Sequence, residues 1–204
     1  MSVRVKICGI TRPGDAAAAA EAGADMIGLN FWPGSRRHVD VATARSIVEA
    51  LPVSVWRVGV FVDASREEIE EIRETLALSA IQLHGDEPTE LLGGWPCPVI
   101  RAVRLRTPED ADRALGAGEP AYYLCEGGAG GGYGGGGESF AWDWAKPFPR
   151  ERLIVAGGLA PDNVAAAVRT LRPFAVDVAS GVESAPGIKD ATRMRELIDN
   201  AKTA

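Results

Sequence analysis

Residues 153–181 read LIVAGGLAPDNVAAAVRTLRPFAVDVASG, and this stretch decides the fold. Two short apolar runs, at 153–156 and 174–178, have the length and composition of buried β-strands. Between them, residues 161–171 have the apolar spacing of an amphipathic helix that begins with proline. A strand, a crossover of helix length and a second strand predict two parallel neighbours in one sheet.

The same unit repeats on both sides of this stretch, and eight alternations of strand and helix can be counted along the chain. The sixth is irregular, because a glycine tract and a weak helical segment near Trp142 follow its strand. The predicted strands cover residues 3–8, 25–31, 56–62, 80–83, 98–103, 121–125, 153–156 and 174–178. The predicted helices cover residues 15–22, 41–51, 66–76, 87–92, 108–115, 161–171 and 191–201.

Eight such units in 204 residues fit the lower end of the size range of a closed (β/α)8 barrel. An open, doubly wound sheet is the alternative. The distinctive side chains and glycines favour the barrel, because they fall where strands end and would converge on one mouth: Cys8, Asn30, His84, Glu126, Gly157 and Ser180. We therefore expect an α/β fold, a single (β/α)8 barrel domain spanning residues 1–204.

Composition excludes several other classes of protein. Hydrophobic residues at 46% and charged residues at 25% argue against a disordered or coiled-coil chain. The net charge of −6, with scattered basic residues, argues against a nucleic-acid partner. No apolar run reaches the roughly 20 residues of a membrane helix, and the start MSVRVKICGI lacks the apolar stretch of a signal peptide. We expect a cytoplasmic protein with no membrane partner.

Three cysteines at no metal-ligand spacing and two histidines disfavour a disulfide framework and a metal site. Residues 127–137 carry glycine at nine of eleven positions, which is the composition of a linker. Because this tract lies inside the sixth unit, we interpret it as a mobile loop over the mouth.

Two loops carry the pattern of a phosphate site. Gly157 and Gly158 follow the seventh strand, and Ser180 and Gly181 follow the eighth. In barrels these two loops often bind phosphate through backbone N–H groups and the positive end of a short helix. The alternative is that the glycines only end strands and form tight turns.

Cys8 is a candidate general base at the end of the first strand. Its side chain shares a face with Arg4 and Lys6, since side chains alternate along a strand. A nearby cation such as Lys6 would favour the thiolate. The alternative is a buried cysteine that acts only as a small hydrophobe.

Three further groups follow strand ends. Arg36 and Arg37 would suit a carboxylate or a phosphate, or form a solvated basic loop. Glu126 could be a general acid or merely a solvated carboxyl. His84 is interpreted as structural or substrate-positioning, because no second histidine or cysteine motif accompanies it.

These segments together resemble the phosphoribosylanthranilate isomerase family, an enzyme family of tryptophan biosynthesis. The resemblance covers nearly the full chain and is carried by residues 6–11, 28–31, 35–37, 58–62, 82–87, 156–159, 161–164 and 177–189.

The resemblance implies a barrel without cofactor or metal that converts N-(5-phosphoribosyl)anthranilate to its 1-deoxyribulose isomer by an Amadori rearrangement. Cys8 would remove the C2′ proton, Arg37 would hold the anthranilate end, and the glycines after strands seven and eight would bind the phosphate. Gln82, His84 and Asp177 would contact the substrate. The phosphorylated substrate is the expected partner, and the expected assembly is a monomer or a homodimer.

The chain departs from the family pattern where the family has its general-acid aspartate at the end of strand six. Here the sequence reads Cys125-Glu126, and Glu138 stands where the family has lysine. Counting back from Phe140 favours Glu126, whereas counting forward along the strand favours Cys125. We expect Glu126 to be the acid, with Asp177 the next candidate.

Two alternatives stay open. One is a barrel that binds a phosphorylated anthranilate analogue without turnover. The other is a related sugar-phosphate isomerase, for example one that also accepts the histidine-pathway aminoimidazole substrate; such enzymes use a pair of aspartates, and Cys8 at the first of these positions disfavours that chemistry.

Overall fold

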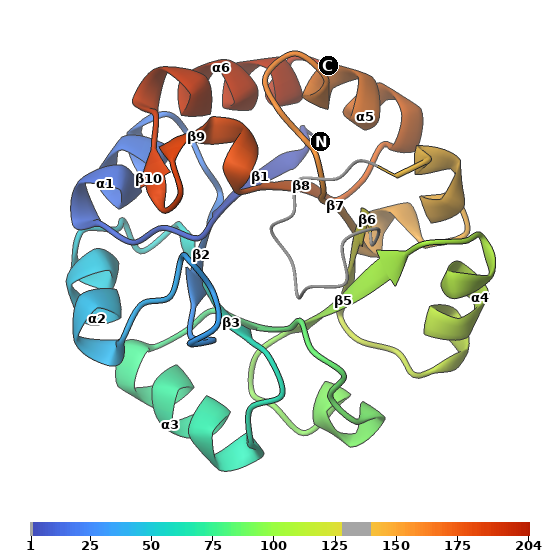
Figure 1. The fold of residues 1–204 in the computed structure, drawn as a ribbon, viewed down its shortest axis with the longest axis horizontal. Helices are drawn as coiled ribbons and strands as arrows, with labels where there is room; N and C mark the ends of the chain where they lie inside the picture. Colours follow the sequence, from blue (N-terminus) through green and yellow to red (C-terminus); the bar gives the residue numbers. More distant parts are fainter. Residues whose placement is uncertain (1, 128–139) are drawn as a thin grey trace.

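The computed structural model describes residues 2–127 and 140–204. Eight parallel strands close into one barrel in sequence order, as the sequence predicts (Figure 1). The strands are β1 (Arg4–Cys8), β2 (Met26–Asn30), β3 (Trp56–Phe61), β4 (Ala80–Leu83), β5 (Val99–Leu105), β6 (Tyr122–Gly127), β7 (Leu153–Val155) and β8 (Ala175–Val178).

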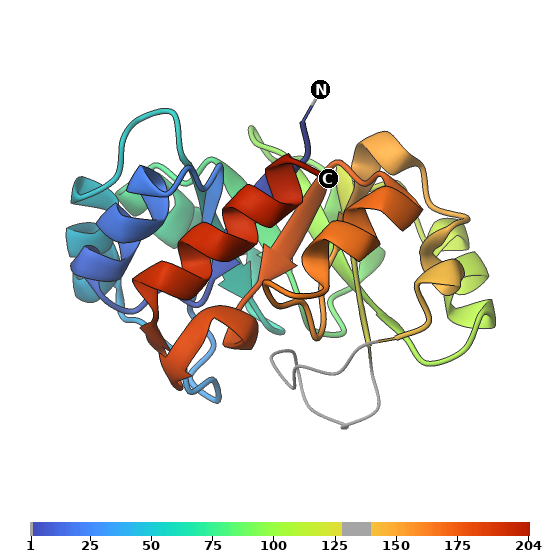
Figure 2. The ribbon, with the colours of Figure 1, turned by 90° about the horizontal axis from the view of Figure 1, so that it is seen from above.

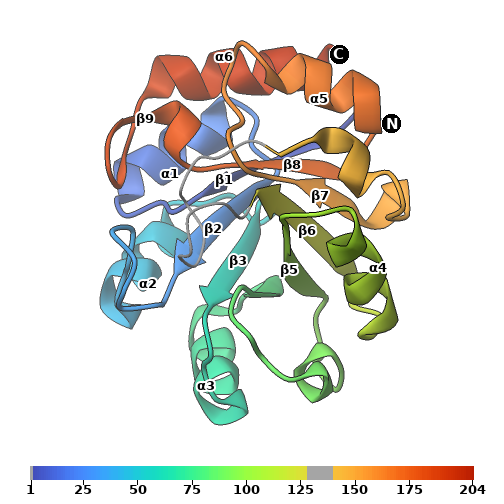
Figure 3. The ribbon, with the colours of Figure 1, turned by 45° about the vertical axis from the view of Figure 1, so that its right-hand side comes forward.

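Helices follow the strands and form an outer ring around the barrel (Figures 1 and 3). Three of them begin at a side chain that accepts a hydrogen bond from a first-turn N–H group: Asp40, Ser65 and Asp190. The helices are α1 (Pro13–Glu21), α2 (Val41–Glu49), α3 (Arg66–Leu76), α4 (Glu109–Gly116), α5 (Val164–Leu171) and α6 (Ala191–Lys202). No helix of the described residues is long and apolar enough to span a membrane.

Two of the expected helices differ in the structure. The helix predicted at 87–92 is wrong: only the 3₁₀ helix η1 (Thr89–Leu92) forms, because Pro88 precedes it and two glycines follow. The weak segment near Trp142 is also a short 3₁₀ helix, η2 (Trp142–Ala145), and another, η3 (Arg150–Arg152), leads into β7. Most of the glycine tract, together with Glu138, lies outside the described residues.

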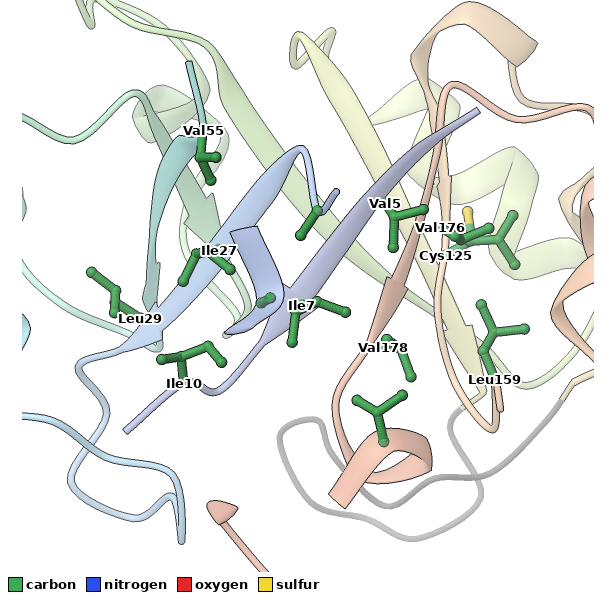
Figure 4. Close-up of a cluster of buried hydrophobic side chains, with 14 of the residues drawn as sticks. Val5, Ile7, Ile10, Ile27, Leu29, Val55, Cys125, Leu159, Val176 and Val178 are labelled. Atoms are coloured by element: carbon green, nitrogen blue, oxygen red, sulfur yellow. The ribbon is translucent and has the colours of Figure 1, made fainter. Parts of the chain in front are cut away.

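Side-chain alternation divides the core into two layers. One side of each strand packs against the helices in an outer apolar cluster, part of which Figure 4 shows around Ile7, Ile27 and Val176. The other side fills the barrel with a smaller cluster that includes Met26, Ile100 and Leu124. Parity along each strand therefore decides whether a residue supports the helices or faces the interior.

Aromatic side chains fill the end of the barrel where the strands begin. Tyr122 stacks on Phe174 with ring centroids 4.4 Å apart, and Trp56 meets Tyr122 edge to face at 6.2 Å. The Arg4 guanidinium lies over Trp56 and Phe174, 5.3 and 5.0 Å from their ring centroids. The interior at this end is packed, so chemistry belongs to the opposite end.

A small hairpin that the sequence did not predict stands beside the C-terminal end of β8 (Figure 2). After β8 come the 3₁₀ helix η4 (Ser180–Val182) and the antiparallel strands β9 (Glu183–Ala185) and β10 (Ile188–Lys189). The hairpin brings two buried charged residues, Glu183 and Lys189, to the mouth.

Candidate active site

Lys6, Cys8 and Asp177 form the first polar cluster, on the neighbouring strands β1 and β8. Lys6 is fully buried, and its Nζ donates a 2.8 Å hydrogen bond to Oδ1 of Asp177. Cys8 lies one pleat nearer the mouth and is partly exposed. Lys6 therefore lies below Cys8 as the cation that the sequence suggested, with Asp177 as its counter-ion.

The charges in this cluster act on one another through a desolvated interior. Burial raises the pKa of the Cys8 thiol, and the attraction of Lys6 only partly opposes this effect. Burial lowers the pKa of Lys6, but Asp177 and Cys8 outweigh it, so the pKa of Lys6 is raised above its usual 10.5. Cys8 is therefore mainly a thiol at neutral pH, and Lys6 stays an ammonium.

Gly28 on β2 leaves the space that this cluster occupies. A Cβ at this position would lie 2.8 Å from Sγ of Cys8 and 3.1 Å from Nζ of Lys6. In the β1–β2 register Gly28 is the direct partner of Cys8. Glycine is required here because a larger residue would displace the Cys8 thiol and the Lys6 ammonium together.

A second cluster lies across the mouth and consists of Gln82 on β4, His84 directly after β4, and Glu126 on β6. His84 Nε2 lies 2.8 Å from Oε1 of Glu126, and Nδ1 lies 2.8 Å from Nε2 of Gln82. With Gln82 donating to Nδ1, Nε2 carries the proton and donates to Glu126. Gln82 is fully buried, whereas His84 and Glu126 retain 8% and 7% exposure at the mouth.

The backbone around His84 is fixed from two directions. Glu87 accepts hydrogen bonds from the N–H groups of Gly85 and Asp63, which ties the loop after β4 to the loop after β3. Arg104, the neighbour of Glu126 in the β5–β6 register, donates to the His84 carbonyl at 2.8 Å. The imidazole is therefore held in place before any ligand arrives.

Cys125 and Glu126 point to opposite sides of β6. Cys125 is fully buried in the outer cluster between barrel and helices, near Val176 in Figure 4. Burial raises the pKa of its thiol far above the usual range. Glu126 faces the interior and His84. Of the two residues between which the sequence could not decide, Glu126 is the one at the mouth.

Arg37, in the loop after β2, makes a bidentate ion pair with Glu183 of the hairpin. Arg37 Nε and Nη2 lie 2.7 and 2.8 Å from the two carboxylate oxygens. Lys189 Nζ donates to Glu183 at 2.8 Å and to the Ala179 carbonyl at 3.0 Å. The stem of Arg37 packs against Gly9, whose φ of +70° and lack of a Cβ permit the contact.

The two glycine loops meet at the mouth. Gly157 and Gly158 have φ angles of +82° and +65°, and both are partly exposed. A Cβ on Gly181 would collide with the Leu159 carbonyl, so the loop after β8 lies directly against the loop after β7. Ser180 is exposed beside them. This is the arrangement expected of a backbone phosphate cradle.

The structure thus brings the residues singled out in the sequence to one end of the barrel, although Gln82 is buried beneath His84. Sequence reasoning assigned no role to Glu183 or Lys189. The available signal was that these two residues are charged in the run 178–189, which is otherwise mostly small and apolar. Among the described residues, no group of three or more His, Cys, Asp or Glu side chains is suited to holding a metal ion.

Two separate clusters of polar and titratable side chains, an arginine and a pair of glycine loops at the mouth of a (β/α)8 barrel are the features of an acid–base enzyme. The family model for N-(5'-phosphoribosyl)anthranilate (PRA) isomerase matches residues 5–200. The chain belongs to this family.

Individual relatives agree with the family match. The N-(5'-phosphoribosyl)anthranilate isomerase of Myxococcus xanthus is 50% identical over 208 residues, covering 100% of this chain and 98% of the relative. The crystal structure of the Thermotoga maritima isomerase superposes with a TM-score of 0.91 at 42% identity, covering 99% of this chain and 100% of that one. Another isomerase structure, in complex with reduced 1-(o-carboxyphenylamino)-1-deoxyribulose 5-phosphate, has a TM-score of 0.85 at 40% identity, with 99% and 100% covered.

Proposed function

We propose that this chain converts N-(5-phosphoribosyl)anthranilate to 1-(2-carboxyphenylamino)-1-deoxyribulose 5-phosphate in tryptophan biosynthesis, with Glu126 as general acid and Cys8 as general base. One observation carries these roles: both side chains lie at the C-terminal ends of their strands, in separate polar clusters at the same mouth. An isomerisation that moves a proton needs a donor and an acceptor at different points of one substrate.

The proposed reaction begins at the furanose ring. Glu126 protonates the ring oxygen, the C1′–O bond breaks, and the nitrogen lone pair forms an iminium with C1′. Cys8, as thiolate, removes the proton from C2′, and the electron pair of that bond neutralises the iminium to give an enolamine. Uptake of a proton at C1′ and loss of one from the C2′ hydroxyl give the ketone, so no atom is gained or lost overall.

The remaining residues bind and position. The backbone of Gly157, Gly158, Ser180 and Gly181 would hold the phosphate. Arg37 would hold the anthranilate carboxylate at the other end of the substrate. His84 would orient the Glu126 carboxyl through their 2.8 Å contact, and Asp177 would keep Lys6 charged beneath Cys8. The proposed reaction uses a phosphorylated substrate, and none of its steps calls for a cofactor.

The assignment of the acid is tested with three variants and the loss of substrate fluorescence as the assay. Glu126→Gln should lower kcat by ~10²-fold or more, because the amide cannot donate the required proton. Glu126→Asp keeps the carboxyl and should retain more activity than Glu126→Gln. Cys125→Ala should leave kcat near the wild-type value. Loss of activity in Cys125→Ala with normal Glu126→Gln would move the acid to the other residue.

The overall activity is tested by complementing a tryptophan auxotroph that lacks this isomerase. Growth is expected with the wild-type chain. Ligand binding by a well-expressed wild-type protein that gives neither growth nor turnover would instead favour a barrel that binds without catalysis.

We further propose that residues 1–204 act as one barrel domain in the cytoplasm, as a monomer or a homodimer. The closed order of all eight strands supports the single domain. Sedimentation of the purified chain distinguishes the two assemblies, and separate unfolding transitions would contradict the single domain.

A further inference from the structure

We propose that Glu183 is a positioning residue: it holds one edge of the Arg37 guanidinium so that the other edge is presented to the carboxylate of the substrate. The inference rests on the proposed function, because only there is Arg37 assigned to the anthranilate end. It goes beyond that assignment by naming the residue that sets the direction of the arginine.

The hydrogen bonds select one edge of the guanidinium. An arginine offers two edges to a carboxylate, one formed by Nε and Nη2 and the other by Nη1 and Nη2. Glu183 occupies the first, with contacts of 2.7 and 2.8 Å. Within residues 2–127 and 140–204, no other acceptor bonds the Arg37 side chain. The second edge is therefore the one left for a ligand.

Burial makes this arrangement rigid. The side chain of Arg37 is 14% exposed and that of Glu183 is 6% exposed. Glu183 also accepts hydrogen bonds from Lys189 Nζ at 2.8 Å and from the Gly187 N–H at 3.2 Å, so the carboxylate is fixed from the hairpin side. A guanidinium held by a fixed carboxylate loses little further freedom when it binds a second one.

A carboxylate beside Arg37 would by itself cancel the positive charge of the guanidinium. Lys189 compensates for this. Arg37 and Lys189 are cationic and Glu183 is anionic, so the three side chains together carry a net charge of +1. Lys189 thus offsets Glu183, and the charge of Arg37 remains available to an anionic ligand. Lys189 also donates to the Ala179 carbonyl, next to the proposed phosphate loop. The same hairpin therefore contacts both Arg37 and the residue that precedes the proposed phosphate loop.

Glu183→Gln separates positioning from simple charge, because the two predict opposite results. The substitution raises the net charge of the three side chains from +1 to +2, so charge alone would tighten the binding of a carboxylate. Loss of the bidentate contact frees the guanidinium to rotate, so positioning predicts weaker binding. We expect KM for N-(5-phosphoribosyl)anthranilate to rise about tenfold or more, with a much smaller change in kcat. An unchanged or lower KM would overturn the proposal.

A substrate without the carboxylate provides the control. N-(5-phosphoribosyl)aniline has the same sugar phosphate and ring but nothing for Arg37 to bind. The wild-type protein should prefer the anthranilate substrate in kcat/KM, and Glu183→Gln should lose about tenfold of that preference. Equal losses on both substrates would show that Glu183 only supports the fold. In an Arg37→Ala background, Glu183→Gln should cost no further selectivity, and an additional loss there would also count against the proposal.

Removing a buried anion leaves Lys189 and Arg37 without their partner, so Glu183→Gln could fail to fold. The double variant Glu183→Gln/Lys189→Met removes both offsetting charges, keeps the net charge at +1 and makes the same prediction of lost selectivity. Retained selectivity in the double variant would overturn the proposal. A wild-type protein without turnover refutes the proposed function and this inference with it. If the wild-type protein turns over and the Glu183 variants keep its preference for the anthranilate substrate, only the inference is refuted.

Discussion

Replacing Lys6 by methionine tests how strongly the interior of the barrel depends on its buried ion pair. Methionine keeps most of the length of lysine but removes the charge, which leaves the Asp177 carboxylate without the donor that lies 2.8 Å away. Breaking a buried pair in this way costs about 3–5 kcal/mol, because the remaining charge is desolvated and uncompensated. Asp177 retains 7% exposure toward the mouth, so we expect the lower end, about 3 kcal/mol. For a chain of this size the midpoint temperature should fall by roughly 6–12 °C.

Urea unfolding followed by circular dichroism measures the loss directly. The control is Lys202→Met, which breaks a 3.0 Å pair with Asp25 whose side chains are 31% and 32% exposed, and which should cost less than about 1 kcal/mol. Lys6→Met/Asp177→Asn, which removes both charges, should recover most of the loss. If Lys6→Met lowers the free energy of unfolding no more than Lys202→Met does, the Asp177 carboxylate is better solvated than its burial indicates, and the reasoning is refuted.

The remaining predictions concern the base. Cys8→Ser should lower kcat by ~10²-fold or more with the fold intact, because serine is a far weaker base; a wild-type kcat would end the assignment. Since the pKa of Cys8 is raised and the thiolate is the reactive form, the rate at which iodoacetamide alkylates Cys8, measured on the peptide that carries it, should climb as the pH rises through the alkaline range, and a flat rate between pH 7 and 9 would contradict this. Because Lys6 lowers that pKa, Lys6→Met should move the rise to still higher pH. Gly28→Ala should reduce kcat, because its methyl group would lie 2.8 Å from the Cys8 sulfur; unchanged kinetics would show that the strands shift to admit it.

The alternation of strands and helices predicted a parallel sheet, because periodicity and parallel crossovers are properties of local sequence, but only the residues at the strand ends favoured a closed barrel over an open sheet. The segment 87–92 was predicted wrongly as a helix for a local reason too, since its flanking proline and glycines permit only one 3₁₀ turn. The candidate site residues could also be identified in the sequence, because they follow predicted strands and strand ends converge on the mouth of a barrel.

What the sequence could not supply were contacts between distant segments. The choice between Cys125 and Glu126 depends on the parity of β6, which the structure fixes through its register with β5. The pairing of Arg37 with Glu183 joins residues 146 positions apart, and no periodicity reports such a contact. The partner of Lys6 is likewise 171 positions away, on the strand that closes the barrel.

The aromatic packing of Tyr122, Phe174 and Trp56 beneath Arg4 has a kinetic consequence. Because these rings fill the N-terminal end of the barrel, small molecules do not pass through it from one end to the other. Substrate must bind and product must leave at the same mouth, at the C-terminal ends of the strands. Accumulated product at this end therefore competes directly with incoming substrate. Sustained turnover therefore depends on how quickly a later reaction removes the product from solution.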